Sequence, residues 1–289
     1  MKDSSLRRIV LSIYKSTTKL FSSLGFGKFV MMRNLNTSIH SHLSSNYARV
    51  NGHKMFLDSL DSLHLSIYGT YETFLTSIIT QEVKKGDTVV DIGANIGYHT
   101  LNFARLVGET GKVYAFEPDH DNFSILKKNV ELNGYKNVVL VNKAITNKTG
   151  RTKLYLSQKN MGAHTLLQAK GNKKFIEVET IRFDDYFKDT KIDFIKVDVE
   201  GSEGLAIQSM RSFFEKTKNL KIITEFWPKG FSMIGMKPEE FIDIFAKDGF
   251  KVYNVNEVEN KMESIQVPEF VNSLISSYED EHTNLLFIK

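Results

Sequence analysis

The sequence predicts an α/β protein in which helices cover both faces of a parallel sheet. Its 289 residues are 41% hydrophobic and 25% charged, the composition of an ordinary globular protein, which excludes a collagen-like or wholly disordered chain. From about residue 86, short apolar runs alternate with helical stretches. This alternation is typical of parallel strands joined by crossover helices.

The predicted elements follow one another in a regular order. A strand over residues 88–92 ends in a glycine-rich turn, and a helix follows over about 98–107. Further strands are expected at 112–117, 137–142, 192–199, 220–226, 250–255 and 284–288, with helices at about 119–133, 204–216 and 238–247.

Residues 150–183 interrupt this order with an inserted hairpin and loop. Residues 152–156 and 175–181 have the pattern of two strands, and the polar loop 158–172 separates them. A long polar loop after a core strand can serve as a substrate lid, or it can be plain surface decoration.

The N-terminal segment differs from the rest in charge. Residues 1–40 carry seven Lys and Arg against one Asp, so the remaining chain is slightly acidic and the overall pI of about 8.9 gives no reason to expect a nucleic-acid partner. Apolar residues at helical spacing and a basic opposite face predict an amphipathic helix that ends at Gly25 and Gly27. We therefore expect a basic helical extension over 1–50 and the α/β domain over 51–289.

Three interpretations of this helix stay open: packing on the main domain, peripheral contact with an anionic membrane surface or a partner, and a transit peptide. No run approaches 18 apolar residues, so no membrane span is expected, and we predict a cytoplasmic protein. Because the chain has no cysteine, disulfides, cysteine metal sites and a thiol nucleophile are excluded.

The strongest local signal is the D-x-G-x-N-x-G pattern of residues 91–97. Gly93 and Gly97 let the backbone approach a ligand closely, and the helix that follows offers free N–H groups. The dinucleotide fingerprint G-x-G-x-x-G is absent. Glu117 closes the next strand, where a carboxylate can accept both ribose hydroxyls of an adenosine ligand; alone, it would be taken for an exposed Glu before Pro118. The turn and Glu117 together favour an adenosine-type cofactor.

The strand at 192–199 becomes charged toward its carboxyl end. Alternation places Lys196, Asp198 and Glu200 on one face, at the edge where open α/β sheets bind ligands. Charges in a central strand are costly unless they pair or meet a ligand. Two interpretations remain: an ion pair that supports the loop, or Asp198 beside a ligand.

Three segments, 89–100, 115–118 and 192–201, resemble the FkbM family of S-adenosylmethionine-dependent methyltransferases. The resemblance runs from about Gly52 to the closing strand 285–289, and the K-x-D-x-E-G run together with the glycine motif makes it specific. It implies a Rossmann-like, doubly wound sheet of seven strands, mostly parallel, with the last strand antiparallel. It also implies methyl transfer, most often to a hydroxyl of a natural product, sugar or lipid.

The resemblance assigns site residues by position. The cofactor loop is matched by Asp91, Gly93, Asn95 and Gly97, the ribose ligand by Glu117, an acidic position ahead of the first strand by Glu72, and the adenine edge by Ala144.

Methyl transfer to a hydroxyl requires alignment and a proton acceptor. We expect Asp198 beside the amino group or sulfonium of the cofactor, with Lys196 orienting that carboxylate or the acceptor. Glu200 and Glu225 border the same cleft, and His99 and His164 are further candidate bases. Asp198, Glu200 and Glu225 could supply an oxygen-rich metal site, but strand-end carboxylates more often serve the cofactor, so no metal is predicted.

Two alternatives to the methyltransferase stay open. One is a nicotinamide-dependent oxidoreductase, which the missing fingerprint and the missing Y-x-x-x-K pair disfavour. The other is a non-catalytic cofactor-binding or membrane-docked scaffold, which the intact set of motif residues disfavours. We expect a small-molecule, sugar or lipid acceptor and no nucleic acid; the oligomeric state is not predictable.

Overall fold

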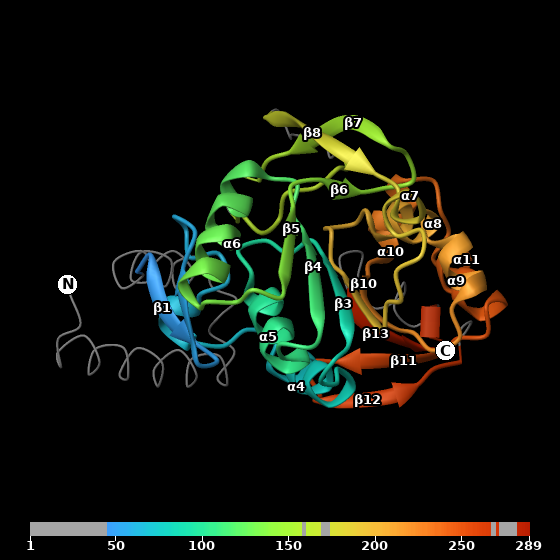
Figure 1. Cartoon of the computed structure of the whole chain (residues 1–289). Coiled ribbons are helices and arrows are strands. Elements are labelled where there is room, and N and C mark those ends of the chain that lie inside the picture. Colours follow the sequence, from blue (N-terminus) through green and yellow to red (C-terminus); the bar gives the residue numbers. More distant parts are fainter. Residues whose placement is uncertain (1–44, 158–159, 169–173, 267–269, 272–281) are drawn as a thin grey trace, which may run out of the picture. The chain divides into compact units, whose positions relative to one another are not determined.

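The computed structural model describes residues 45–157, 160–168, 174–266, 270–271 and 282–289 (Figure 1). The chain divides into two compact units, Met1–Tyr71 and Glu72–Lys289. The predicted N-terminal amphipathic helix and its membrane contact fall on residues 1–44, outside the described residues. In the part that is described, no helix is both long enough and apolar enough to cross a membrane.

The described part of the first unit is a small hairpin with one short helix. Strands β1 (Tyr47–Val50) and β2 (His53–Phe56) pair antiparallel, and α3 spans Leu65–Tyr68. Met55 and Leu65 are buried, so the described part of this unit contains buried apolar side chains.

The second unit is built on an eight-stranded sheet in the order β12-β11-β13-β10-β9-β3-β4-β5. The five strands from β10 to β5 run parallel, and β13 lies antiparallel between β10 and β11. The bounds are β3 Thr88–Ile92, β4 Lys112–Phe116, β5 Val138–Val141, β9 Phe194–Val197, β10 Lys221–Phe226, β11 Lys251–Asn256, β12 Lys261–Ser264 and β13 Thr283–Ile288.

The mostly parallel sheet with an antiparallel last strand agrees with the prediction, but the predicted count of seven strands does not. The eighth strand is β12, which pairs with β11 at the edge of the sheet. All four of its residues are exposed, so no apolar run marks this strand in the sequence.

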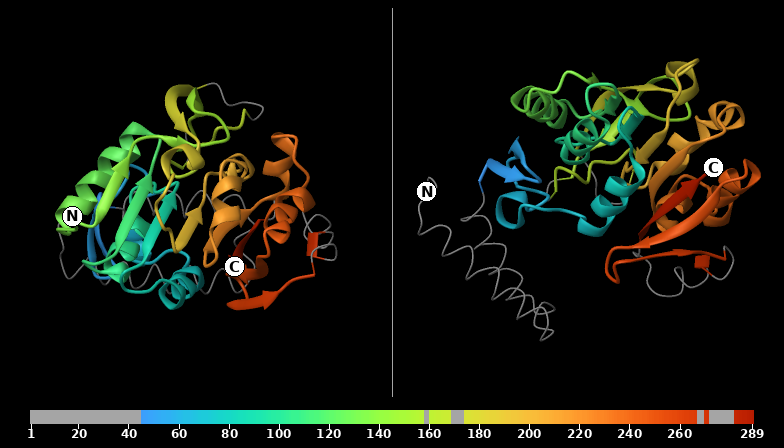
Figure 2. Two further views of the ribbon diagram at one scale, coloured as in Figure 1. Left: turned by 45° about the vertical axis from the view of Figure 1, so that its right-hand side comes forward. Right: turned by 60° about the horizontal axis from the view of Figure 1, so that its bottom comes forward.

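Helices cover both faces of the sheet, as predicted (Figure 2). Neighbouring residues of β3 point to opposite faces: Val89 packs with α4 and α5, and Val90 belongs to the cluster that contains α9 and α11. The predicted helix at 204–216 is divided into α8 and α9. The bounds are α4 Thr73–Glu82, α5 Tyr98–Val107, α6 His120–Leu132, α7 Phe183–Tyr186, α8 Glu203–Gln208, α9 Arg211–Lys216, α10 Pro228–Met233 and α11 Pro238–Lys247.

The inserted segment forms a separate three-stranded sheet in the order β6-β8-β7. β7 (Gly150–Tyr155) and β8 (Phe175–Ile181) are the predicted hairpin, and β6 (Ala144–Ile145) adds a short parallel strand. Because β6 begins just after β5 ends, the insertion starts at the carboxyl edge of the main sheet (Figure 1). Of the predicted loop 158–172, residues 160–168 are described, and Thr165 bridges to Tyr155.

Candidate active site

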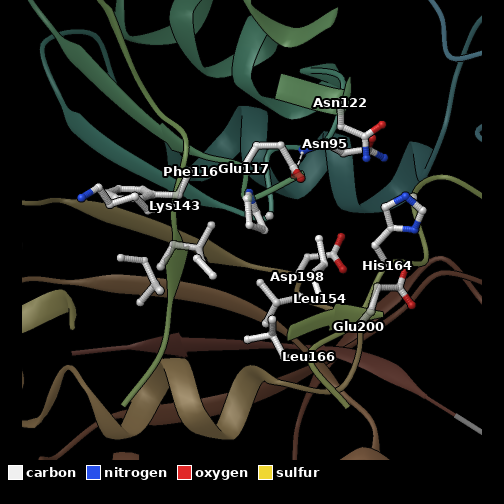
Figure 3. Close-up of a pocket in the computed structure, with 17 residues that line it drawn as sticks. Asn95, Phe116, Glu117, Asn122, Lys143, Leu154, His164, Leu166, Asp198 and Glu200 are labelled. Atoms are coloured by element: carbon white, nitrogen blue, oxygen red, sulfur yellow. Dashed lines mark hydrogen bonds between the residues drawn. The ribbon is translucent and has the colours of Figure 1, made fainter. Parts of the chain in front are cut away.

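A pocket opens at the carboxyl ends of β3, β4 and β9, where α/β sheets bind ligands (Figure 3). Six predicted site residues line it: Gly93, Asn95, Glu117, Ala144, Asp198 and Glu200. The insertion contributes Gly162, His164 and Leu166 to the lining. The remaining predicted residues, Glu72, Asp91, Gly97, Lys196 and Glu225, do not line this pocket.

The glycine turn packs directly on the end of β9. Gly93 has a φ of +84°, and the N–H groups of Gly93 and Ala94 both donate to the carbonyl oxygen of Phe116. A Cβ built on Gly93 would lie 1.7 Å from the carbonyl oxygen of Asp198. Only glycine therefore allows the turn to lie against the strand that carries Asp198.

Replacing this glycine is expected to damage the fold more than replacing an open one. Gly93→Ala should lower the free energy of unfolding by about 2–4 kcal/mol, because it adds a clash with backbone to a left-handed conformation. Gly134→Ala is the matched control: its φ is +74° and no atom lies within 4 Å of the added Cβ, so it should cost only about 1 kcal/mol. Urea denaturation measures the free energy of unfolding of both variants. Equal losses of stability would show that the close approach of Gly93 to the Asp198 carbonyl does not matter.

Glu117 directly follows β4, and its buried carboxyl faces the pocket (Figure 3). Its Oε2 accepts the N–H of Asn95 at 2.8 Å, and its Oε1 accepts the N–H of Asp119 at 2.9 Å. Burial raises the pKa of Glu117 from 4.5 to about 8, although these two hydrogen bonds act in the opposite direction. The carboxyl is therefore poised to ionise when a ligand supplies further donors.

Three buried side-chain acceptors near the glycine turn have no hydrogen-bond donor among the described residues. They are Oδ1 of Asp91, Asn95 and Asn122. The other carboxylate oxygen of Asp91 accepts from Thr100 at 2.6 Å, and the amide of Asn122 donates to the carbonyl of Met161 at 2.9 Å. Since an unpaired buried acceptor is costly, the site fits a ligand rich in donors.

Lys196 and Asp198 form the ion pair that was one of the two interpretations of this strand. Lys196 Nζ donates to Asp198 Oδ2 at 2.8 Å; the lysine side chain is buried, whereas that of Asp198 is 35% exposed. Burial alone would raise the pKa of Asp198, but the charge and hydrogen bond of Lys196 outweigh it and lower that pKa. Asp198 is therefore both paired and open to the pocket.

A second group of carboxyls lies beside Asp198. Oxygens of Asp198, Glu203 and Glu225 lie within 4.8 Å of one another. Burial, together with neighbouring carboxyl groups, raises the pKa of Glu225 to about 10 and that of Glu200 to about 8. The sequence offered Asp198, Glu200 and Glu225 as a possible oxygen cluster without predicting a metal there; the structure groups Asp198 and Glu225 with Glu203.

Glu203 is the site residue that sequence reasoning missed. Burial raises its pKa to about 7, while the N–H groups of Val199 and Gly201 donate to its Oε1 and act in the opposite direction. These bonds fold the carboxyl back from the first turn of α8 toward the strand end. The alternation of side chains along β9 ends before the first turn of α8, so the sequence pattern does not indicate that Glu203 reaches the site.

The other predicted residues lie around this centre. Glu72 precedes α4, and its Oε2 lies 3.2 Å from Nε2 of His99, whose Nδ1 is buried without a partner among the described residues. His164 lines the pocket, and its Nδ1 accepts the N–H of Ser157 at 3.1 Å.

Part of the backbone strain lies at this site. Of the seven described non-glycine residues with a positive φ, three lie near it: Glu72 at 42°, Asn95 at 49° and Glu200 at 52°. Such conformations cost about 1–3 kcal/mol each and cluster at functional sites.

Comparison with known proteins places this geometry in a family. The model of the family described as "Methyltransferase FkbM domain" matches residues 91–268, more than half of the chain. This range includes the pocket, the Lys196–Asp198 pair and the three clustered carboxyls.

Individual relatives are more distant. A protein-L-isoaspartate O-methyltransferase of Methanococcoides burtonii is 37% identical over 60 residues, which are 21% of this chain and 30% of that protein. A probable cobalt-precorrin-6B C(15)-methyltransferase of Sulfurisphaera tokodaii is 43% identical over 56 residues, 19% of this chain and 29% of that protein. The matches span less than a third of the length of these curated relatives. The crystal structure of a putative rRNA-methylase from Clostridium thermocellum aligns with 74% of this chain and 93% of its own, at 18% identity and a TM-score of 0.48.

Proposed function

Because this chain belongs to the FkbM methyltransferase domain family, whose methyl donor is S-adenosylmethionine, we propose that it transfers that methyl group to a hydroxyl oxygen of a small molecule, sugar or lipid. The observation that carries the proposal is a pocket lined by the buried carboxyl of Glu117 and by Asn95 and Asn122, whose side-chain oxygens have no hydrogen-bond donor among the described residues. S-adenosylmethionine offers the matching donors: two ribose hydroxyls, the adenine amine and the ammonium group.

The residues present fit this cofactor. Glu117 would accept the ribose hydroxyls, since its two oxygens keep lone pairs beyond the backbone bonds. Asn95 and Asn122 would accept from further donors of the cofactor, and the backbone of Ala144 would lie at the adenine edge.

The inserted loop would have to move to admit the cofactor. The pocket encloses about 50 Å³, whereas small-molecule sites span about 300–1,000 Å³. Among the described residues, two side-chain hydrogen bonds join residues 160–168 to the loops at the sheet edge: Asn122 to the carbonyl of Met161, and Thr165 Oγ1 to the carbonyl of Glu200 at 2.6 Å. The backbone of Thr165 also pairs with that of Tyr155, so a lid movement would carry the segment on the inserted hairpin or break this bridge.

The charges around Asp198 suit the cationic end of the cofactor. Asp198 is ionised because Lys196 lowers its pKa, so its negative charge would stabilise the ammonium or sulfonium group. Burial and neighbouring carboxyl groups raise the pKa of Glu200 to about 8, and in its ionised form it would take the proton of the acceptor hydroxyl. S-adenosylmethionine would supply the methyl group, with the new oxygen–carbon bond replacing the carbon–sulfur bond and S-adenosylhomocysteine as the other product.

Transfer of radioactive methyl groups tests this proposal. The full chain is incubated with methyl-labelled S-adenosylmethionine and separate sugar, lipid, small-molecule, protein and RNA fractions of a cell extract. We expect enzyme-dependent label in one of the first three fractions, recovered as a methyl ether. Label confined to RNA or protein would contradict the proposed acceptor, and no transfer to any fraction would favour a non-catalytic scaffold.

A further inference from the structure

Three carboxyl groups from separate elements converge beside the pocket. Asp198 follows β9, Glu203 opens α8 and Glu225 lies on β10, and one oxygen of each lies within 4.8 Å of the others. We call these residues the three-carboxylate cluster. Like charges at this spacing repel one another unless protons or a cation neutralise them.

A second observation concerns the buried member of the cluster. Glu203 is 0% exposed, and its Oε1 accepts the N–H groups of Val199 and Gly201 at 2.9 and 3.2 Å. Its Oε2 is also buried and has no hydrogen-bond partner among the described residues. A buried carboxylate oxygen without a donor is costly, so this atom is suited to a bound cation.

The spacing and the ligand type indicate which cations fit. Two oxygens bound to one ion lie at most about 4.2 Å apart around Mg²⁺ and about 5 Å apart around Ca²⁺, twice the respective bond lengths. The spacing of up to 4.8 Å therefore suits Ca²⁺ as it stands, and the carboxylates would draw slightly closer around the smaller Mg²⁺ or Mn²⁺. An all-carboxylate donor set, without histidine or cysteine, suits cations that prefer oxygen. Asp198 Oδ2 accepts from Lys196, which leaves Oδ1 for an ion.

We propose that the three-carboxylate cluster binds one divalent cation of the oxygen-preferring class, such as Mg²⁺, Mn²⁺ or Ca²⁺. Water fills the coordination positions that the protein leaves open. Because Asp198 also lines the pocket, an acceptor oxygen could replace one of these waters, and with the ion bound Asp198 would serve the acceptor instead of the cationic end of the cofactor; this last step alone rests on the proposed methyl transfer.

Manganese titration of the full chain tests the cation site without cofactor or acceptor. The free-Mn²⁺ signal in electron paramagnetic resonance falls as the ion binds, so it reports affinity and number of sites directly. We expect one site, from which Mg²⁺ or Ca²⁺ displaces Mn²⁺. Glu203→Gln and Glu225→Gln should each weaken binding at least about tenfold, since each removes one charged ligand.

Glu257→Gln is the matched control. The carboxylate of Glu257 also accepts two backbone N–H groups, those of Phe74 and Leu75, but it lies outside the cluster. This variant should bind Mn²⁺ as the wild type does. If Glu203→Gln fails to fold by circular dichroism, Glu225→Gln decides the question, because the side chain of Glu225 is 18% exposed and better tolerates a change.

Two results would overturn the cation site: no Mn²⁺ binding by the wild type, or equal binding by the wild type and Glu225→Gln. A parallel titration with S-adenosylmethionine and a methyl-transfer assay in EDTA keep the two proposals apart. Cofactor binding and methyl transfer without any Mn²⁺ binding would overturn the cation site alone. Mn²⁺ binding at the cluster without any methyl transfer would support the cation site and overturn the proposed function.

Discussion

Asp198→Asn should leave the fold intact and lower the turnover of methyl transfer at least about a hundredfold. The change keeps the shape of the side chain but removes the negative charge that Lys196 stabilises beside the pocket. Loss of one electrostatic partner in an active site typically costs about 10²–10³ in rate. The turnover is measured as the rate of labelled-methyl transfer to the extract fraction that the wild-type chain labels.

An exposed aspartate provides the control for this variant. Asp121 lies on α6 with its side chain 82% exposed, so Asp121→Asn should keep wild-type turnover. Thermal melts of both variants separate misfolding from lost chemistry. Wild-type turnover in folded Asp198→Asn would move the chemistry elsewhere, with His99 the next candidate.

Glu117→Ala should weaken binding of S-adenosylmethionine at least about tenfold. The variant loses two hydrogen bonds from ribose hydroxyls to a carboxylate, each contributing about 1.5–3 kcal/mol. Glu117→Gln keeps one acceptor oxygen and should fall between the wild type and the alanine variant. Calorimetric titration gives all three dissociation constants, and an unchanged constant in Glu117→Ala would refute the ribose assignment.

The same carboxyl should make cofactor affinity depend on pH. Without cofactor its pKa is about 8, so at pH 6 it is mostly protonated. Hydroxyl donors favour the ionised form, so binding releases a proton, and affinity should rise from pH 6 up to about pH 8 and then level off. Glu117→Gln should flatten this dependence of affinity on pH. A wild-type affinity that does not change with pH would contradict the proposed ionisation of Glu117 on cofactor binding.

The main sheet was predictable because its strands are buried. The apolar runs at 88–92 and 112–116 and the helix between them appear where the pattern placed them. Helix α4 was not predicted from the sequence. The N–H groups of Phe74 and Leu75 at its start bond to Glu257, which is more than 180 residues away along the chain, so no local pattern reveals this cap.

The candidate site was predictable where it follows the strand ends. The positions of Gly93, Glu117 and Asp198 around one pocket follow from parallel strands that finish at the same edge. Glu203 could not be found in this way, because its place depends on how the turn after β9 folds back.

Calorimetric titration of the wild-type chain with S-adenosylmethionine and, separately, with NAD⁺ distinguishes a methyltransferase site from an oxidoreductase site. The pocket at the ends of β3, β4 and β9 should bind one S-adenosylmethionine per chain and should not bind NAD⁺. Binding of NAD⁺ without binding of S-adenosylmethionine would refute the assigned cofactor and with it the proposed methyl transfer.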